Sequence, residues 1–139
     1  MADVYSVAEW LRYARMDYDA AMHLRSFYPM PIEIICYHCQ QAAEKVLKAV
    51  LIHHGKEVPH IHDTQLLWKL AAALEPTLSP FMPQSSRLAN FATITRYPKE
   101  LQLNENDMQG ALDDARAIVE AIEALYQDDG DAKNSAPPF

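Results

Sequence analysis

The stretch that decides the fold is IICYHCQQAAEKVLKAVLIHH, residues 34–54. Placed on a helix at about 100° per residue, it has a broad apolar face and a narrow polar one. The apolar face consists of Ile35, Cys36, Cys39, Ala42, Ala43, Val46, Leu47, Ala49, Val50 and Leu51. Because so wide an apolar face needs cover on more than one side, we predict the central helix of a helical bundle.

The polar face of this helix is the first candidate for a functional surface. It contains Tyr37, Gln41, Glu44, Lys45 and Lys48, with His38 at its border. Spacing alone favours a solvated face with one intrahelical contact between Gln41 and Lys45, which lie one turn apart.

The overall composition fits one helical domain. The 139 residues are 50% hydrophobic and 22% charged, with only 3 Gly, which favours helix over sheet. The net charge of −7 is uneven: residues 100–139 carry ten acidic and two basic residues, a net of −8, and residues 1–99 carry nine acidic and ten basic, a net of +1. A general polyanion binder is therefore not expected, although residues 1–99 can carry a local basic site.

The sequence has no pattern typical of a membrane or secreted protein. No apolar run is long enough to span a membrane, and the N-terminus lacks a charged segment followed by an apolar one. We therefore expect a soluble cytoplasmic protein whose two cysteines stay reduced. Cys36 and Cys39 have a C-x-x-C spacing, but no second pair completes a zinc site, and we interpret them as buried thiols.

Periodicity and capping residues predict the remaining elements. The expected helices cover residues 7–27, 32–54, 65–74, 85–93 and 105–127. Residues 76–84 hold three prolines and are expected to form a connector with at most one helical turn. The fold class is therefore all-α, an antiparallel up-and-down four-helix bundle with an additional short helix, spanning residues 1–127. Residues 128–139 lack periodicity and are expected to be a disordered tail.

Charged positions on the outer helices lead to two further expectations. Asp17 lies near the apolar face of the first helix, so it should have a cationic partner, either Lys45 or Arg96. On the last helix, four acids are expected to face water, namely Asp113, Asp114, Glu120 and Glu123. Trp10 is expected to be a core residue rather than a stacking platform.

Two short motifs allow both a functional and a structural interpretation. Four histidines, at positions 53, 54, 60 and 62, surround the loop after the central helix, but no nearby carboxylate has a catalytic spacing. We expect one loop histidine to cap the bundle or contact a ligand, and no metal. In Arg96-Tyr97-Pro98, the Arg and Tyr can present donors at a fixed angle, or they can simply end a helix. No nucleophile motif or catalytic acid pair is present.

Several of these motifs resemble HEPN domains. Residues 39–49, CQQAAEKVLKA, are similar to the second-helix signature QQAxEKxLKA of that family, and this is the specific part. The first helix resembles the family's opening, with Trp10, Ala14, Asp17 and Ala21. His62 before Leu66-Leu67, and Arg96-Tyr97-Pro98 before the last helix, follow the family's order. The resemblance covers about residues 6–126.

The resemblance implies a homodimeric bundle of four main helices and a short extra one. HEPN domains often accompany a minimal nucleotidyltransferase, some have been thought to bind nucleotides, and many are RNA-cutting toxins. Those nucleases have an Arg and a His separated by four to six residues, in a general acid–base mechanism. Here the corresponding positions after Arg96 are Leu101, Gln102 and Leu103, and no His follows His62. The family's usual nuclease mechanism is therefore not expected.

The resulting hypothesis is a homodimeric, non-catalytic domain that binds a nucleotide or a partner nucleotidyltransferase. The expected binding residues are Gln41, Lys45, His62, Arg96 and Tyr97, supported by Asp17 and Glu44. No cofactor is expected. The alternatives are a metal-independent ribonuclease, with Arg96 on the phosphate and His62 as the base, and a purely structural dimer. In the structural alternative, Asp17, Lys45 and Arg96 form a buried network.

Overall fold

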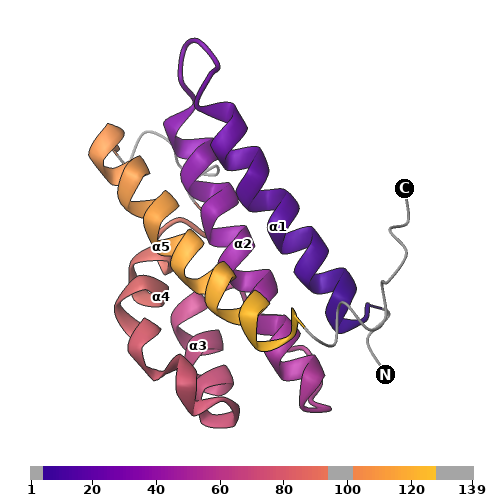
Figure 1. The fold of residues 1–139 in the computed structure, drawn as a ribbon. Helices are drawn as coiled ribbons and strands as arrows, with labels where there is room; N and C mark the ends of the chain where they lie inside the picture. The colour runs from indigo at the N-terminus through magenta and orange to yellow at the C-terminus, as the bar shows by residue number, and fades with distance from the viewer. Residues whose placement is uncertain (1–4, 94–101, 128–139) are drawn as a thin grey trace, which may run out of the picture.

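The computed structural model describes residues 5–93 and 102–127, and these residues form an all-α bundle. The elements are α1 (Val7–Leu24), α2 (Ile32–His53), α3 (Thr64–Leu74), the 3₁₀ helix η1 (Pro76–Phe81), α4 (Met82–Ala89) and α5 (Glu105–Leu125). α1 and α2 form a long antiparallel hairpin, α5 lies against it, and the short α3 and α4 pack around the far end of α2 (Figure 1). The expected fold class is confirmed.

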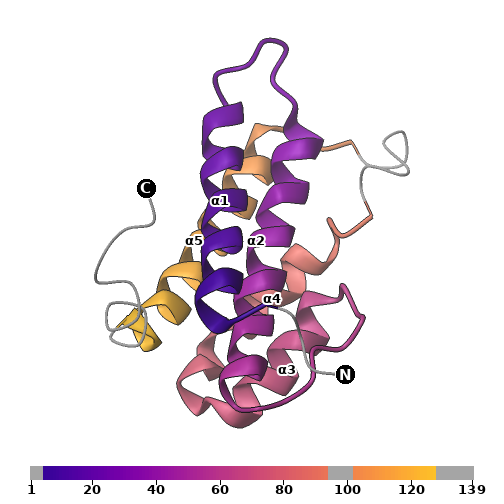
Figure 2. The same cartoon turned by 90° about the vertical axis from the view of Figure 1, so that its right-hand side faces the viewer.

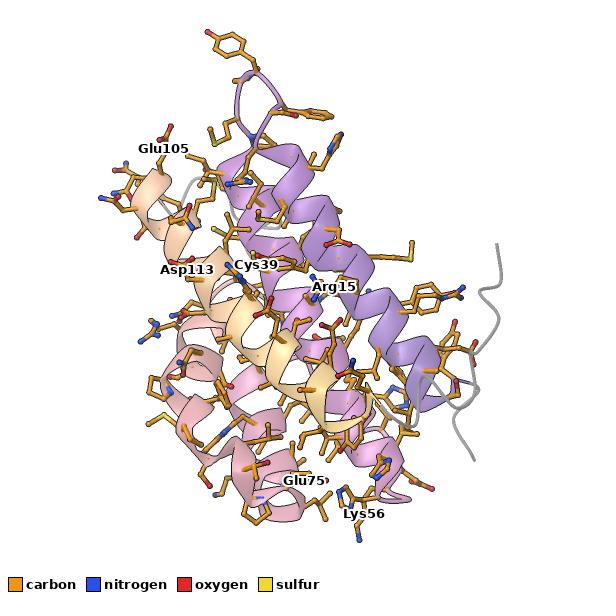
Figure 3. The ribbon with its side chains drawn as sticks, in the orientation of Figure 1. Arg15, Cys39, Lys56, Glu75, Glu105 and Asp113 are labelled. Atoms are coloured by element: carbon orange, nitrogen blue, oxygen red, sulfur yellow. The ribbon has the colours of Figure 1, made fainter. Side chains whose placement is uncertain are left out.

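The central position of α2 is also confirmed. All ten residues of its expected apolar face are at most 3% exposed, and α1, α3, α4 and α5 all contact this helix. Cys39 lies in this interior (Figure 3). Burial raises the pKa of the Cys36 thiol to about 12 and raises that of Cys39 further. Both thiols therefore stay protonated and pack as small apolar groups.

Side-chain caps explain where three of the helices begin. Ser6 and Glu9 form a reciprocal capping box at the start of α1, and Asn104 and Asp107 form another at the start of α5. The Asp63 side chain accepts from two backbone N–H groups at the start of α3. These polar residues satisfy backbone donors that a helix start leaves free, so the sequence positions the helix starts accurately.

Two helix boundaries differ from the prediction. α1 ends at Leu24 rather than at residue 27, because the Arg25 and Ser26 side chains bond to carbonyls of its last turn. α4 covers Met82–Ala89 rather than residues 85–93, with Pro83 in its first turn. Proline fits there because the first N–H groups of a helix have no partner within it. The expected proline-rich connector is largely η1.

Two of the four acids expected to face water on α5 are engaged with neighbouring helices instead. Asp114 is only 8% exposed and accepts two bonds from Arg87 of α4, at 2.8 and 2.9 Å. Glu123 accepts from Arg15 of α1, whose position opposite α5 is visible in Figure 3. Charge spacing on α5 alone does not reveal these arginines, because they belong to other helices.

Hydropathy gives one further result. None of the helices in residues 5–93 and 102–127 is long and apolar enough to cross a membrane.

Candidate functional site

The polar face of α2 is partly covered, so the solvated face favoured by spacing is found only at its half-exposed residues, which are Tyr37, His38, Gln41 and Lys45. Glu44 and Lys48 are only 4% and 5% exposed. α1 and the loop between α2 and α3 lie over this face, at the end of the bundle where α1 begins (Figure 2). An acid and a base buried together need partners, because burying a charge without compensation costs several kcal/mol.

Glu44 is the centre of the resulting network. One carboxylate oxygen, Oε2, accepts from Lys48 Nζ at 2.9 Å, and the other, Oε1, accepts from Gln40 Nε2 at 3.1 Å. Gln40 is completely buried, and its amide also donates to the His62 carbonyl at 2.8 Å. The backbone of the α2–α3 loop is therefore held directly on α2, which positions His62 above Glu44.

The ring of His62 is exposed and lies directly on the buried Glu44 carboxylate. Its Nδ1 lies 3.1 and 3.2 Å from the two oxygens of Glu44, while 69% of its side chain is exposed. A carboxylate at Nδ1 favours the tautomer that carries hydrogen on that nitrogen. The Nε2 atom is then left for solvent or a ligand. Such a ring can bind an anion when protonated, or accept a proton when neutral.

The side chain of Gln41 hydrogen-bonds to Gln40 and Glu44 rather than to Lys45, the partner that spacing favours. Its amide donates to Gln40 Oε1 at 2.8 Å, and its Nε2 lies 3.5 Å from Glu44 Oε1. Two consecutive glutamines thus extend the hydrogen bonding from Glu44 toward the half-exposed edge of α2. Gln40 was not identified by the sequence analysis, because spacing placed it beside the apolar face rather than on the polar one.

A second polar pair links α1 and α2 next to this network. Asp17 pairs with Lys45, one of the two partners expected, and also contacts His38 Nδ1 at 3.0 Å. Burial opposes ionisation of Asp17, but the hydrogen bonds from His38 and Lys45 outweigh it, so the pKa of Asp17 is lowered. Asp17 is therefore ionised at neutral pH and holds the Lys45 ammonium.

Aromatic rings cover the Lys48 end of the network. The centroid of the Trp10 ring lies 6.0 Å from Lys48 Nζ and 5.5 Å from the centroid of the Tyr5 ring. The Tyr5 ring also packs edge-on against Tyr13, with 5.8 Å between the ring centroids. Trp10 is partly buried, so it is neither a full core residue nor an open platform. Tyr5 and Tyr13 were missed in the sequence, although the spacing of Trp10 and Tyr13 places both on one side of α1.

The charges of the site compensate each other. Asp17 and Glu44 carry two negative charges, which Lys45 and Lys48 balance. A phosphate therefore has to meet His62 and compete with Asp17 for Lys45. This arrangement favours modest, selective anion binding over strong attraction of polyanions.

Two expected site residues, Arg96 and Tyr97, lie outside the described residues. Among the described residues no three His, Cys, Asp or Glu side chains are grouped closely enough to hold a metal ion. Two histidines of the loop region, His53 and His54, lie at the end of α2 instead. There His54 pairs with Glu75 at 3.0 Å, and the His53 ring packs against Tyr126.

A model of the HEPN domain matches residues 7–125. The chain belongs to the HEPN domain family. The HEPN match includes every described residue of the site except Tyr5. A search among curated proteins found no match.

Solved structures show the same HEPN fold. TT1696 from Thermus thermophilus is 23% identical with a TM-score of 0.65, covering 85% of this chain and 96% of that one. ST0689, described as an archaeal HEPN homologue, is 22% identical with a TM-score of 0.69, covering 88% of this chain and 98% of that one. At these identities the likeness shows the fold alone.

Proposed function

We propose that this HEPN domain binds a nucleotide through its phosphate, at His62 and the adjoining polar face of α2. Lys45 and His62 meet the phosphate, and Gln41 supplies hydrogen bonds. Asp17 and Glu44 orient the two cationic groups. Arg96 and Tyr97, outside the described residues, belong to the same proposed set. The Arg–His nuclease spacing of the family is missing from this sequence, so the proposed role is binding without that chemistry.

The observation that carries the proposal is the combination of exposure and support at His62. A histidine that serves only to fill the loop has no need of a buried carboxylate beneath it. Here Glu44 is 4% exposed and contacts the ring at 3.1 Å, while the ring itself remains largely in solvent. The cost of burying Glu44 is offset partly by Lys48, and the arrangement fixes the direction of His62 Nε2.

The test compares nucleotide-induced thermal stabilisation in matched variants. AMP and ATP are titrated against the intact chain, with sodium chloride matched in ionic strength as the reference. A ligand at 100 times its Kd stabilises by about 2.7 kcal/mol, which raises the Tm measurably. His62→Ala and Lys45→Ala should abolish the shift. Their controls, His60→Ala and Lys56→Ala, change exposed residues of the same loop and should keep it.

Asp17→Asn separates binding from a purely structural network. Asn keeps an acceptor that can orient Lys45 but removes the negative charge that competes with phosphate, so nucleotide binding should become tighter while the protein itself becomes less stable. A structural network predicts loss of stability in Asp17→Asn and Lys45→Ala with no ligand effect in either. That second result, or equal shifts in His62→Ala and His60→Ala, would overturn the proposal.

Family membership supports two further parts of this function, a homodimer and a minimal nucleotidyltransferase partner. Both are tested on the intact chain. Light scattering gives the mass in solution, for which we expect twice that of the 15.8 kDa chain. Co-expression with a candidate minimal nucleotidyltransferase should yield a complex that survives gel filtration. A monomeric mass would exclude the homodimer. Two separate peaks in gel filtration would exclude the complex with the nucleotidyltransferase.

The pairing of His62 with Glu44 also favours a second candidate, a metal-independent ribonuclease. A carboxylate on Nδ1 orients the imidazole and favours hydrogen on that nitrogen, so Nε2 is free to take a proton from a ribose 2′-hydroxyl. Cleavage of short RNA in the presence of a chelator should then disappear in His62→Ala and persist in His60→Ala. Activity no higher than the buffer blank would eliminate this candidate.

A further inference from the structure

The aromatic cluster at the start of α1 is more than packing around a helix end. Tyr5 meets Trp10 and Tyr13 edge-on, with ring planes at 77° and 74° to its own. In spite of these two contacts, 43% of Tyr5 is exposed, so part of its ring is accessible to a ligand. The Arg12 guanidinium lies 5.1 Å from the Tyr13 ring centroid. Aromatic rings with a neighbouring cation are the usual surface on which nucleobases stack.

The cluster is continuous with the proposed phosphate site. The Trp10 ring is 6.0 Å from Lys48 Nζ, and Lys48 shares the Glu44 carboxylate with His62. The start of α1 and the α2–α3 loop lie at the same end of the bundle in both views of the fold (Figures 1 and 2). An exposed aromatic surface and an exposed imidazole therefore adjoin one buried ion pair.

The Trp10 indole gives an independent sign that the cluster is incomplete by itself. Its Nε1 is buried and has no hydrogen-bond acceptor among the described residues. Within that part of the chain, no other buried side-chain donor lacks an acceptor. Most buried polar atoms in folded proteins are hydrogen-bonded, so an N–H of this kind calls for a specific explanation. A ligand that inserts beside Tyr5 can supply the missing acceptor.

We propose that the exposed ring of Tyr5, held in place by Tyr13, stacks the base of the nucleotide whose phosphate meets His62. This inference rests on the proposed function and specifies its ligand class: a nucleoside phosphate, recognised by its base as well as its charge, rather than phosphate or a phosphosugar. A free mononucleotide and one nucleotide of an RNA strand share this chemistry. Specificity among bases is not expected to be high, because every base offers a flat face for stacking.

Tryptophan fluorescence gives a direct measurement, because the chain has only two tryptophans. Trp68→Phe leaves Trp10 as the single reporter, at the cost of the bond from Trp68 Nε1 to the Leu78 carbonyl. This variant is titrated with AMP, the dinucleotide ApA, ribose 5-phosphate and inorganic phosphate. AMP should change the emission of Trp10 at concentrations where ribose 5-phosphate has little effect. ApA binding as tightly as AMP or more tightly would indicate an RNA strand as the source of the base, and weaker ApA binding a free nucleotide.

Matched tyrosine variants locate the base. Tyr5→Ala and Tyr13→Ala should weaken AMP binding by about 5- to 150-fold, the range found for loss of one stacked base, and leave ribose 5-phosphate binding unchanged. Tyr28→Ala is the control, since Tyr28 is 99% exposed in the hairpin between α1 and α2, at the opposite end of the bundle. Circular dichroism and thermal unfolding verify that each variant folds.

The failures of the two proposals look different. Equal affinities for AMP and ribose 5-phosphate, both abolished by His62→Ala, would refute base stacking and leave phosphate binding in place. AMP affinity unaffected in Tyr5→Ala and Tyr13→Ala would also refute base stacking. If none of the four ligands binds, the proposed function itself fails.

Discussion

Two ion pairs of the same type, one in α2 and one in α5, behave differently because of what covers them. Each joins an acid and a base four residues apart on one helix: Glu44 with Lys48 at 2.9 Å, and Arg116 with Glu120 at 3.1 Å. The first pair has side chains 7% and 6% exposed, whereas the second has side chains 63% and 53% exposed. The spacing is the same and the distances are nearly so; the order of acid and base and the type of base differ, but the largest difference between the two pairs is burial.

The difference arises from the neighbours of each helix. α5 contacts the bundle along one face, and its outer face remains in water, where Arg116 and Glu120 are screened by solvent. α2 is enclosed by α1, by the α2–α3 loop and by the other helices, so the part of its polar face that holds Glu44 and Lys48 is covered as well as its apolar face. An ion pair on the exposed face of α5 adds little stability. In the buried pair of α2, removing one member leaves an unpaired buried charge, which lowers the stability strongly.

The largest expected effect is therefore at the buried pair. Glu44→Ala should destabilise the protein by about 3–5 kcal/mol, because it leaves the Lys48 ammonium buried without an anion. Urea unfolding measured by circular dichroism provides the value. The double variant Glu44→Leu/Lys48→Met should recover most of the loss, since neither charge is then buried. A loss below about 1 kcal/mol in Glu44→Ala would remove the contrast between the two helices.

An intermediate effect is expected where α4 meets α5. Arg87→Ala should cost about 1–2 kcal/mol, because Asp114, with a side chain only 11% exposed, loses both of its bonds. Asp114→Ala should cost less, since the Arg87 side chain is 59% exposed and water can solvate it. Chemical denaturation of the two variants compares the costs directly, and the reverse order would contradict the solvation argument.

The contact between Asp17 and Lys45 should give a smaller, pH-dependent effect. The folded pKa of Asp17 is lowered, so its contribution is fully present above the unfolded value of about 3.9 and is lost as pH falls through the folded value. Asp17→Asn should therefore be less stable than the wild type by about 1 kcal/mol at about pH 7. The difference should shrink below about pH 4. Thermal unfolding at neutral pH and at about pH 3 tests this. A stability difference between the two proteins that grows in acid would contradict a lowered pKa of Asp17.

The smallest effect is expected at the exposed pair of α5. Arg116→Ala should leave the unfolding midpoint unchanged within error, because both side chains of the pair are more than half exposed. The measurement is made at about 50 mM and about 500 mM salt, and no salt-dependent difference from the wild type is expected. A clear destabilisation would show that exposure is a poor guide to the contribution of these pairs.

Much of the fold follows from local sequence. The apolar face of residues 34–54 predicts the buried central helix, and Asp63 and Asn104 mark two helix starts to within a residue. These features succeed because periodicity and capping depend on residues close together in the chain. The end of α1 was predicted three residues too late, since the competing bonds of Arg25 and Ser26 have no distinctive sequence pattern.

The candidate site was predicted less completely. The sequence identified Glu44, Lys45 and His62, largely through the resemblance to the family, and it correctly gave Lys45 as one of two partners for Asp17. It did not identify Gln40, which joins α2 to the carbonyl of His62, or the ring of Tyr5 beside Trp10. Arg96 and Tyr97 remain predictions, because they lie outside the described residues.

By itself, the sequence determined that this protein is an all-α bundle with residues 34–54 at its centre. Helix periodicity and end caps are local properties, and they do not depend on which neighbour covers which face. Only the tertiary structure decided that Glu44 and Lys48 on the polar side of that helix are buried, because α1 and the α2–α3 loop come from distant parts of the chain. It thereby separated the buried pair of Glu44 and Lys48 from the exposed pair of Arg116 and Glu120, which have the same spacing.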